Sequence, residues 1–135
     1  MDDLFLLGRI IFGGFFVYQG LHHFVATAAL TQYAAAKGVP LPEIAVLVAG
    51  LLIIVGGLCV LTGYQPLFGL ACIALFLFCV TPVMHNFWAE SNPAQRLDDM
   101  GNFLKNMALF GATLMLSGVP LPWPHSLRVR RRISL

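Results

Sequence analysis

Four apolar stretches in this sequence are each close to the length of a helix that crosses a lipid bilayer. They cover about residues 4–24, 43–62, 67–87 and 101–118. A bilayer core needs about 20 apolar residues of helix, and backbone groups inside it find no water to bond. The runs are continuous, as in LLIIVGGLCVL, and do not alternate like the strands of a membrane barrel. We therefore predict an all-α integral membrane protein, an up-down bundle of four helices.

The composition agrees with a membrane protein. The chain is 59% hydrophobic and 10% charged, whereas soluble domains average about 25% charged residues. So few charges cannot cover the surface of a soluble enzyme, and they do not fit a disordered chain or a nucleic-acid-binding domain. The sequence has no repeat and no linker, so we expect residues 1–135 to form one membrane domain with a basic tail at 125–135.

Residues that favour helix ends and turns predict where the spans begin and end. Pro42 suits the start of the second helix, and residues 62–66 (TGYQP) form a tight turn. Residues 25–42 are expected to form a long first loop. Asp98 or Asp99 is expected to cap the fourth helix. The start, Met-Asp-Asp, has no basic region and the first apolar run exceeds a usual signal sequence, so the first span is expected to be permanent.

The distribution of basic residues predicts the orientation in the membrane. With both termini in the cytoplasm, five of the eight Lys and Arg residues lie inside, four of them in the tail at 128–132. Lys37, Arg96 and Lys105 then lie outside. The positive-inside rule therefore favours a multi-pass protein of the bacterial cytoplasmic membrane, N-in and C-in. In this orientation Trp123 is expected at the inner interface.

Three histidines are the candidate cofactor-binding residues. The predicted orientation brings His22, His23 and His85 to the outer face at similar depth. Histidine can bond a quinone head, move a proton or hold a metal, and the same residues could instead be polar side chains that meet water and headgroups. A quinone is the favoured cofactor over haem, and without HExxH or another ligand spacing we expect no metal site.

Other polar residues are predicted to have structural or lipid-contacting roles. Arg9 could reach the inner headgroups, or it could face inward toward a buried acceptor or an anionic ligand. Asn102 and Asn106 could bond across the bundle. Lys105 and the tail residues Arg128, Arg130, Arg131 and Arg132 could meet headgroups. Cys59, Cys72 and Cys79 form no CxxC motif, so we interpret them as small apolar residues in preference to a redox dithiol.

Four blocks in order resemble the DoxX family of small bacterial membrane proteins. They are Gly8-Arg9 with IIFGGFFVYQGLHHF, then VAGLLIIVGGLCVLTG, then Val83-Met84-His85-Asn86-Phe87-Trp88, and last Asn102-Phe103-Leu104-Lys105-Asn106 with MALFGATLML. The resemblance covers residues 8–116 and implies a four-helix membrane fold. One difference is that many members carry an acid before the paired glycines of the second helix, where this chain has Ile53-Ile54-Val55.

The resemblance implies a link to membrane redox chemistry, because the family takes its name from components of an archaeal thiosulfate:quinone oxidoreductase and terminal oxidase. Together with the small soluble mass, it favours an accessory subunit of a larger redox or energy-converting complex. The partners would then be the bilayer and other membrane subunits. The alternative is a quinone- or thiol-linked oxidoreductase or its quinone-handling subunit. A third reading is a small transporter or lipid-binding protein.

Overall fold

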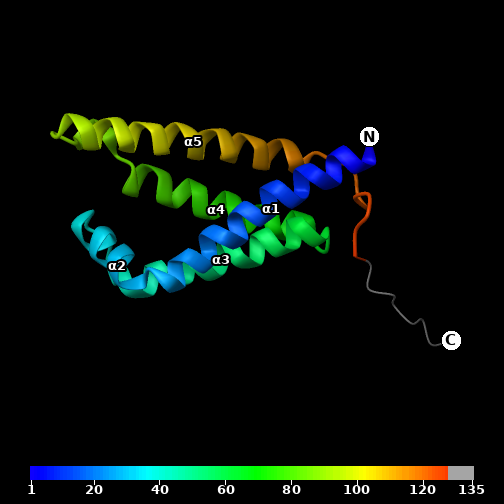
Figure 1. Cartoon of the computed structure of the whole chain (residues 1–135), viewed down its shortest axis with the longest axis horizontal. Coiled ribbons are helices and arrows are strands. Elements are labelled where there is room, and N and C mark those ends of the chain that lie inside the picture. The colour runs from blue at the N-terminus through cyan, green and yellow to red at the C-terminus, as the bar shows by residue number, and fades with distance from the viewer. Residues whose placement is uncertain (128–135) are drawn as a thin grey trace.

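The computed structural model describes residues 1–127, and its regular elements are all helices (Figure 1). The described residues contain no strand, so the all-α prediction is confirmed. The elements are α1 (Asp2–Val25), α2 (Thr27–Ala36), α3 (Pro42–Thr62), α4 (Pro66–Met84), a short 3-10 helix η1 (Phe87–Ala89) and α5 (Pro93–Ser117). The predicted tail site at Arg128, Arg130, Arg131 and Arg132 lies outside the described residues.

The prediction of four helices was wrong, because the expected loop at 25–42 contains α2. A run of alanines with Thr and Gln favours helix even though it is too short and too polar to cross a bilayer. The last helix also starts earlier than expected. Asn92 caps α5 by accepting hydrogen bonds from the amides of Ala94 and Gln95, and Pro93 takes the first position. Asp99 is therefore inside α5 and does not cap it.

Three helical segments are long and apolar enough to cross a membrane, namely Asp2–Val25, Pro42–Thr62 and Pro66–Ala89. Among the described residues α5 is not one of them. Its first two turns carry Arg96, Asp98 and Asp99, and its later part carries Asn102, Lys105 and Asn106. The fourth predicted span, 101–118, falls on this later part, and the helix ends at Ser117.

Glycines bring the long helices into close antiparallel contact. A Cβ on Gly13 of α1 would lie 2.7 Å from the carbonyl oxygen of Gly57 on α3, and a Cβ on Gly20 would lie 2.7 Å from that of Gly50. Gly56 meets Gly69 of α4 in the same way. Such contacts need residues without side chains. The main packing then follows the order α1, α3, α4, α5, while α2 lies against α3.

A buried arginine forms hydrogen bonds at the end of the bundle where the chain starts. Arg9 is 1% exposed and donates to the carbonyl oxygens of Val60 at 3.1 Å, Leu61 at 3.0 Å and Pro124. The first two carbonyls belong to the last turn of α3, where helix carbonyls have no partner inside the helix. Of the two roles considered for Arg9, the inward one is found, and its acceptors are backbone oxygens.

The segment after α5 folds back over this arginine. Trp123 is 1% exposed, lies edge-on to Phe5 at 5.3 Å and covers the guanidinium at 5.6 Å. Leu127 donates to the carbonyl oxygen of Thr62 at 3.0 Å. Trp123 is therefore a core residue and is not exposed on the surface, while its expected depth at the inner interface stays a prediction. Both ends of the described chain lie at this end of the bundle (Figure 1).

Candidate functional site: an apolar cavity with a polar end

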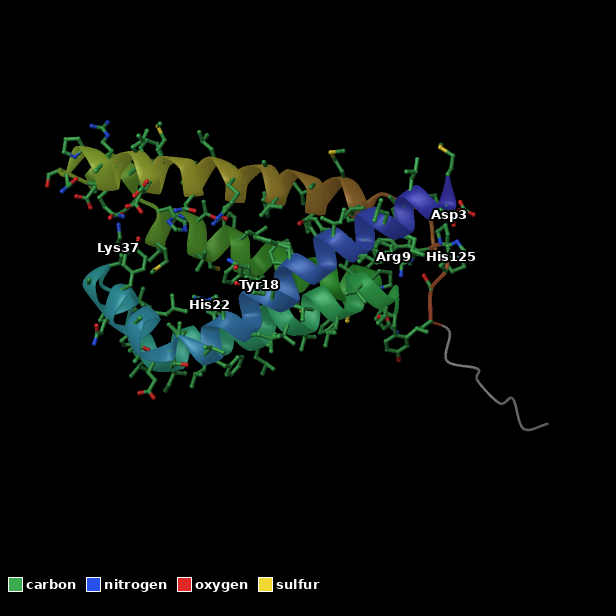
Figure 2. The ribbon with its side chains drawn as sticks, in the orientation of Figure 1. Asp3, Arg9, Tyr18, His22, Lys37 and His125 are labelled. Carbon is green, nitrogen blue, oxygen red and sulfur yellow. The ribbon has the colours of Figure 1, made fainter. Side chains whose placement is uncertain are left out.

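The opposite end of the bundle holds a cavity of about 700 Å³. All five α-helices contribute to its wall, which is mostly Phe, Leu, Val and Ala. The polar side chains on it are Gln19, His23, Tyr33, His85, Lys105 and Asn106. Figure 2 places Arg9 and Lys37 at opposite ends of the molecule, with Lys37 at the cavity end. A large apolar space with a few polar groups is typical of a ligand site.

The three predicted histidines have different places. His85 and His23 both line the cavity, but His22 is exposed and does not. The His23 ring contacts Phe76 of α4 at 6.0 Å between centroids, and Phe76 precedes His85 by nine positions, which is about 13 Å along a helix. His23 and His85 nevertheless line the same cavity, and the similar depth of the three histidines in a membrane stays a prediction.

His23 is fixed by its own helix. Its Nδ1 lies 2.8 Å from the carbonyl oxygen of Gln19. A carbonyl only accepts, so Nδ1 carries the proton and Nε2 is left as an acceptor.

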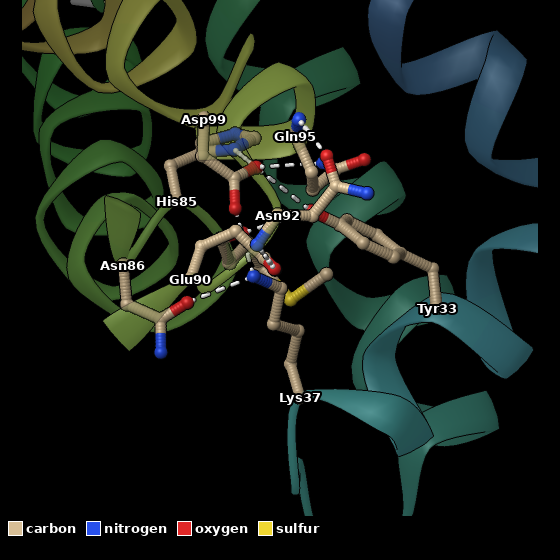
Figure 3. Close-up of polar contacts among 9 residues, drawn as sticks. Tyr33, Lys37, His85, Asn86, Glu90, Asn92, Gln95 and Asp99 are labelled. Carbon is tan, nitrogen blue, oxygen red and sulfur yellow. Dashed lines mark hydrogen bonds and ion pairs between the residues drawn. The ribbon is translucent and has the colours of Figure 1, made fainter. Parts of the chain in front are cut away.

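The polar end of the cavity is built around a buried aspartate (Figure 3). The side chain of Asp99 is 1% exposed, and its Oδ2 accepts from the ammonium of Lys37 at 2.9 Å. Its Oδ1 accepts from the Gln95 amide at 3.3 Å and lies 3.2 Å from the Tyr33 hydroxyl, whose one proton it shares with the carbonyl oxygen of Met84 at 3.0 Å. Lys37 also donates to Asn86 Oδ1 at 2.8 Å. These contacts join α2, α5 and the end of α4.

His85 stands beside this network without completing it. Its Nδ1 is buried, lies 3.7 Å from Asp99 Oδ1 and has no hydrogen-bond partner among the described residues. A separation of 3.7 Å is too long for a hydrogen bond but close enough for the carboxylate to act on the ring.

The surroundings shift the pKa values of two groups in the network. Burial alone would raise the pKa of Asp99, but the hydrogen bond and charge of Lys37, with the bonds from Gln95 and Tyr33, bring it below the ordinary value. Burial, followed by the charge of Asp99, raises the pKa of Tyr33 to about 12. Asp99 is thus ionised and Tyr33 neutral at physiological pH.

A second, smaller pocket of about 360 Å³ lies on the other side of Tyr33. Its lining is polar and includes Lys37, Asn86, Glu90 and Gln95. The Tyr33–Lys37–Asp99 network therefore stands between a polar pocket and the apolar cavity.

Sequence reasoning missed Tyr33, Lys37 and Asp99. Tyr33 and Lys37 are four residues apart, as are Gln95 and Asp99, so each pair shares a helix face. This spacing could have predicted that the paired side chains lie together. For Tyr33 and Lys37 it does so only when residues 25–42 are expected to be helical. Among the described residues the buried acid is Asp99, and it comes from α5.

The remaining predicted residues divide between the cavity and the surface. Asn106 is buried and, with Lys105, lines the cavity. Lys105 donates to Asn102 at 2.9 Å on α5. Cys79 lines the cavity, while all three cysteines are free. Within residues 1–127, no group of three or more His, Cys, Asp or Glu side chains is placed to hold a metal ion.

Comparison with known proteins identifies relatives in membranes. The model of the DoxX family matches residues 4–86. The inner membrane protein YphA of Escherichia coli K12 is 27% identical over 132 residues, which cover 96% of this chain and 89% of that protein. No solved structure matches.

Proposed function

Because this chain belongs to the DoxX family of small integral membrane proteins, we propose that it is an accessory subunit of a larger membrane redox complex that holds an amphipathic quinone in its cavity. The cavity is the observation that carries the proposal. Its apolar wall suits an isoprenoid tail, and its polar end suits a head with oxygen atoms. The inner membrane location of the Escherichia coli relative supports the same location here. The excess of basic residues in the predicted inner segments supports a cytoplasmic place for both termini.

The chemistry of the lining residues fits a quinone. Asn106 can donate a hydrogen bond to an oxygen of the head, and His23 and His85 offer ring nitrogens. A bound quinone supplies two-electron redox chemistry, while these side chains bind and orient it. The electron donor would belong to a partner subunit.

The cavity part of the proposal is tested by filling the cavity. The full chain would be purified from native membranes in mild detergent, and extracted small molecules would be identified by mass spectrometry. We expect an isoprenoid quinone with the wild type and at least about tenfold less with Ala49→Phe, which adds a ring on the cavity wall. Ala71→Phe adds the same ring at an exposed position away from the cavity and should retain the quinone.

Other outcomes of this experiment would support a different ligand or contradict the proposal. Glycerolipid in place of quinone, lost in the same Ala49→Phe variant, would support the lipid-binding reading. Equal quinone content in both variants would contradict the cavity as its site. The accessory role requires a defined partner in the same preparation, and a chain that runs alone after cross-linking in native membranes would contradict that role.

A further inference from the structure

His85 lies between the buried carboxylate of Asp99 and the cavity. Its Nδ1 is buried, unpartnered among the described residues and 3.7 Å from Asp99 Oδ1, and His85 is one of the residues that line the cavity. Figure 3 shows the ring next to the carboxylate.

The charge of Asp99 decides which nitrogen carries the proton. Asp99 is anchored as a carboxylate by Lys37 at 2.9 Å and by the Tyr33 and Gln95 bonds. A carboxylate attracts an N–H and repels a nitrogen lone pair. In the neutral ring the proton therefore sits on Nδ1, and Nε2 carries the lone pair.

We propose that His85 is a specificity-determining residue that accepts a hydrogen bond at Nε2 from a hydroxyl group on the ligand head. This inference rests on the proposed function, since it needs an amphiphile in the cavity. A hydroxyl can donate a hydrogen bond to Nε2. A carbonyl oxygen at the same place has no proton to donate, so its lone pair would face the lone pair of Nε2. Asn106 does not discriminate between the two forms of the head, because a hydroxyl oxygen and a carbonyl oxygen can each accept a hydrogen bond from its amide. The site therefore favours the hydroxyl form of a head over its carbonyl form.

Two kinds of amphiphile carry such a hydroxyl: a hydroquinone, which is the reduced form of a quinone, and a lipid alcohol such as diacylglycerol. Binding of each would be measured to the full chain in lipid nanodiscs. The first arm compares a short-tail ubiquinol with its ubiquinone, kept anaerobic. The second compares diacylglycerol with triacylglycerol, which lacks the hydroxyl.

We expect the wild type to bind the hydroxyl form about tenfold more tightly in one of these arms. In the quinone arm this preference would raise the midpoint potential of the bound quinone by about 30 mV. His85→Phe keeps a ring of similar size and should reduce the preference to within about twofold, while the carbonyl form still binds. His22→Phe, at an exposed histidine outside the cavity, should leave the preference unchanged.

Asp99→Asn tests the role of the carboxylate separately. An amide can donate to Nδ1, which would move the ring proton to Nε2 and turn it into a donor. We expect the preference to fall or to reverse toward the carbonyl form, an effect that loss of packing alone would not produce.

The outcomes separate the two proposals. Equal binding of both forms to the wild type, or an unchanged preference in His85→Phe, would overturn the inference and leave the cavity proposal standing. Failure of every probe to bind would overturn both. A preference seen only in the lipid arm would keep the hydroxyl recognition and assign it to a lipid.

Discussion

Lys37 and Asp99 stand 62 positions apart in the chain, and their side chains meet at 2.9 Å in the interior of the protein. The Lys37 side chain is 13% exposed and the Asp99 side chain 1%. The pair joins α2 to α5 and closes the polar end of the cavity. A buried ion pair costs desolvation on both sides, so its removal has different effects depending on whether one or both partners are lost.

Lys37→Met should therefore destabilise the protein by about 3–5 kcal/mol, because it leaves the Asp99 charge buried without its cation. The double variant Lys37→Met, Asp99→Leu should recover most of this loss. Unfolding in mixed detergent micelles would measure both values. Arg96→Met removes an exposed cation from α5 and should cost less than about 0.5 kcal/mol. A double variant as unstable as the single one would contradict the uncompensated charge as the cause.

Asp99 also predicts how stability depends on pH. Its pKa in the folded protein is lower than the ordinary carboxyl value, so the unfolded chain takes up the proton first as pH falls. The stabilisation is complete above the unfolded pKa, near pH 4, and is lost as pH falls through the folded pKa. The Lys37→Met, Asp99→Leu variant should show a smaller loss of melting temperature below pH 4 than the wild type. Parallel curves for the two proteins would contradict this assignment.

Tyr33 should ionise at a pH far above that of ordinary phenols. Burial and the charge of Asp99 raise its pKa to about 12, because both oppose a second negative charge at this place. Ultraviolet titration of phenolate in the wild type, minus that of Tyr33→Phe, isolates this group. The difference should have its midpoint near pH 12. A midpoint near 10 would mean that Tyr33 faces water.

Arg9 should be irreplaceable by lysine. Its guanidinium donates to three carbonyl oxygens through separate nitrogens, and a lysine has one nitrogen on a differently shaped stem. We expect a loss of about 2 kcal/mol for Arg9→Lys and about 3 kcal/mol or more for Arg9→Met, which leaves the carbonyls without a donor. Detergent unfolding measures both. Equal stability of Arg9→Lys and the wild type would show that charge alone matters.

Two adjacent glycines of α1 give a matched pair of variants. An added Cβ on Gly13 would meet backbone atoms of α3, whereas one on Gly14 would have no neighbour within 4 Å. Gly13→Ala should cost at least about 2 kcal/mol, since the two helices must separate. Gly14→Ala should be neutral or stabilise by up to about 0.5 kcal/mol through helix propensity. Similar losses for both would contradict the close contact with α3.

The spans could be predicted because bilayer thickness and backbone bonding act on continuous apolar runs. As expected, α3 begins at Pro42 and ends at Thr62, just before Gly63. The start of α5 was not predicted, because its polar first turns are stabilised by the Asn92 cap and by contacts with Tyr33 of α2 and with Lys37 at the end of α2. Hydropathy alone contains no such information.

The candidate site was predictable only in part. Helix direction and length predicted that His23 and His85 lie toward the same end of the bundle, and both line one cavity. The partners of His85 could not be foreseen, since they depend on α2 folding and turning Tyr33 and Lys37 toward Asp99. Contacts of this kind follow from tertiary packing and leave little trace in a single sequence.

The contact between Arg9 and Pro124 has a consequence for how the protein is made. These residues are 115 positions apart, so the third acceptor of Arg9 is synthesised long after α1. The carbonyls of Val60 and Leu61 become available only after α3 has been made. Until Trp123 and Pro124 follow, the guanidinium lacks part of its final set of contacts. Synthesis of this late segment is thus the step that completes the attachment of the first helix.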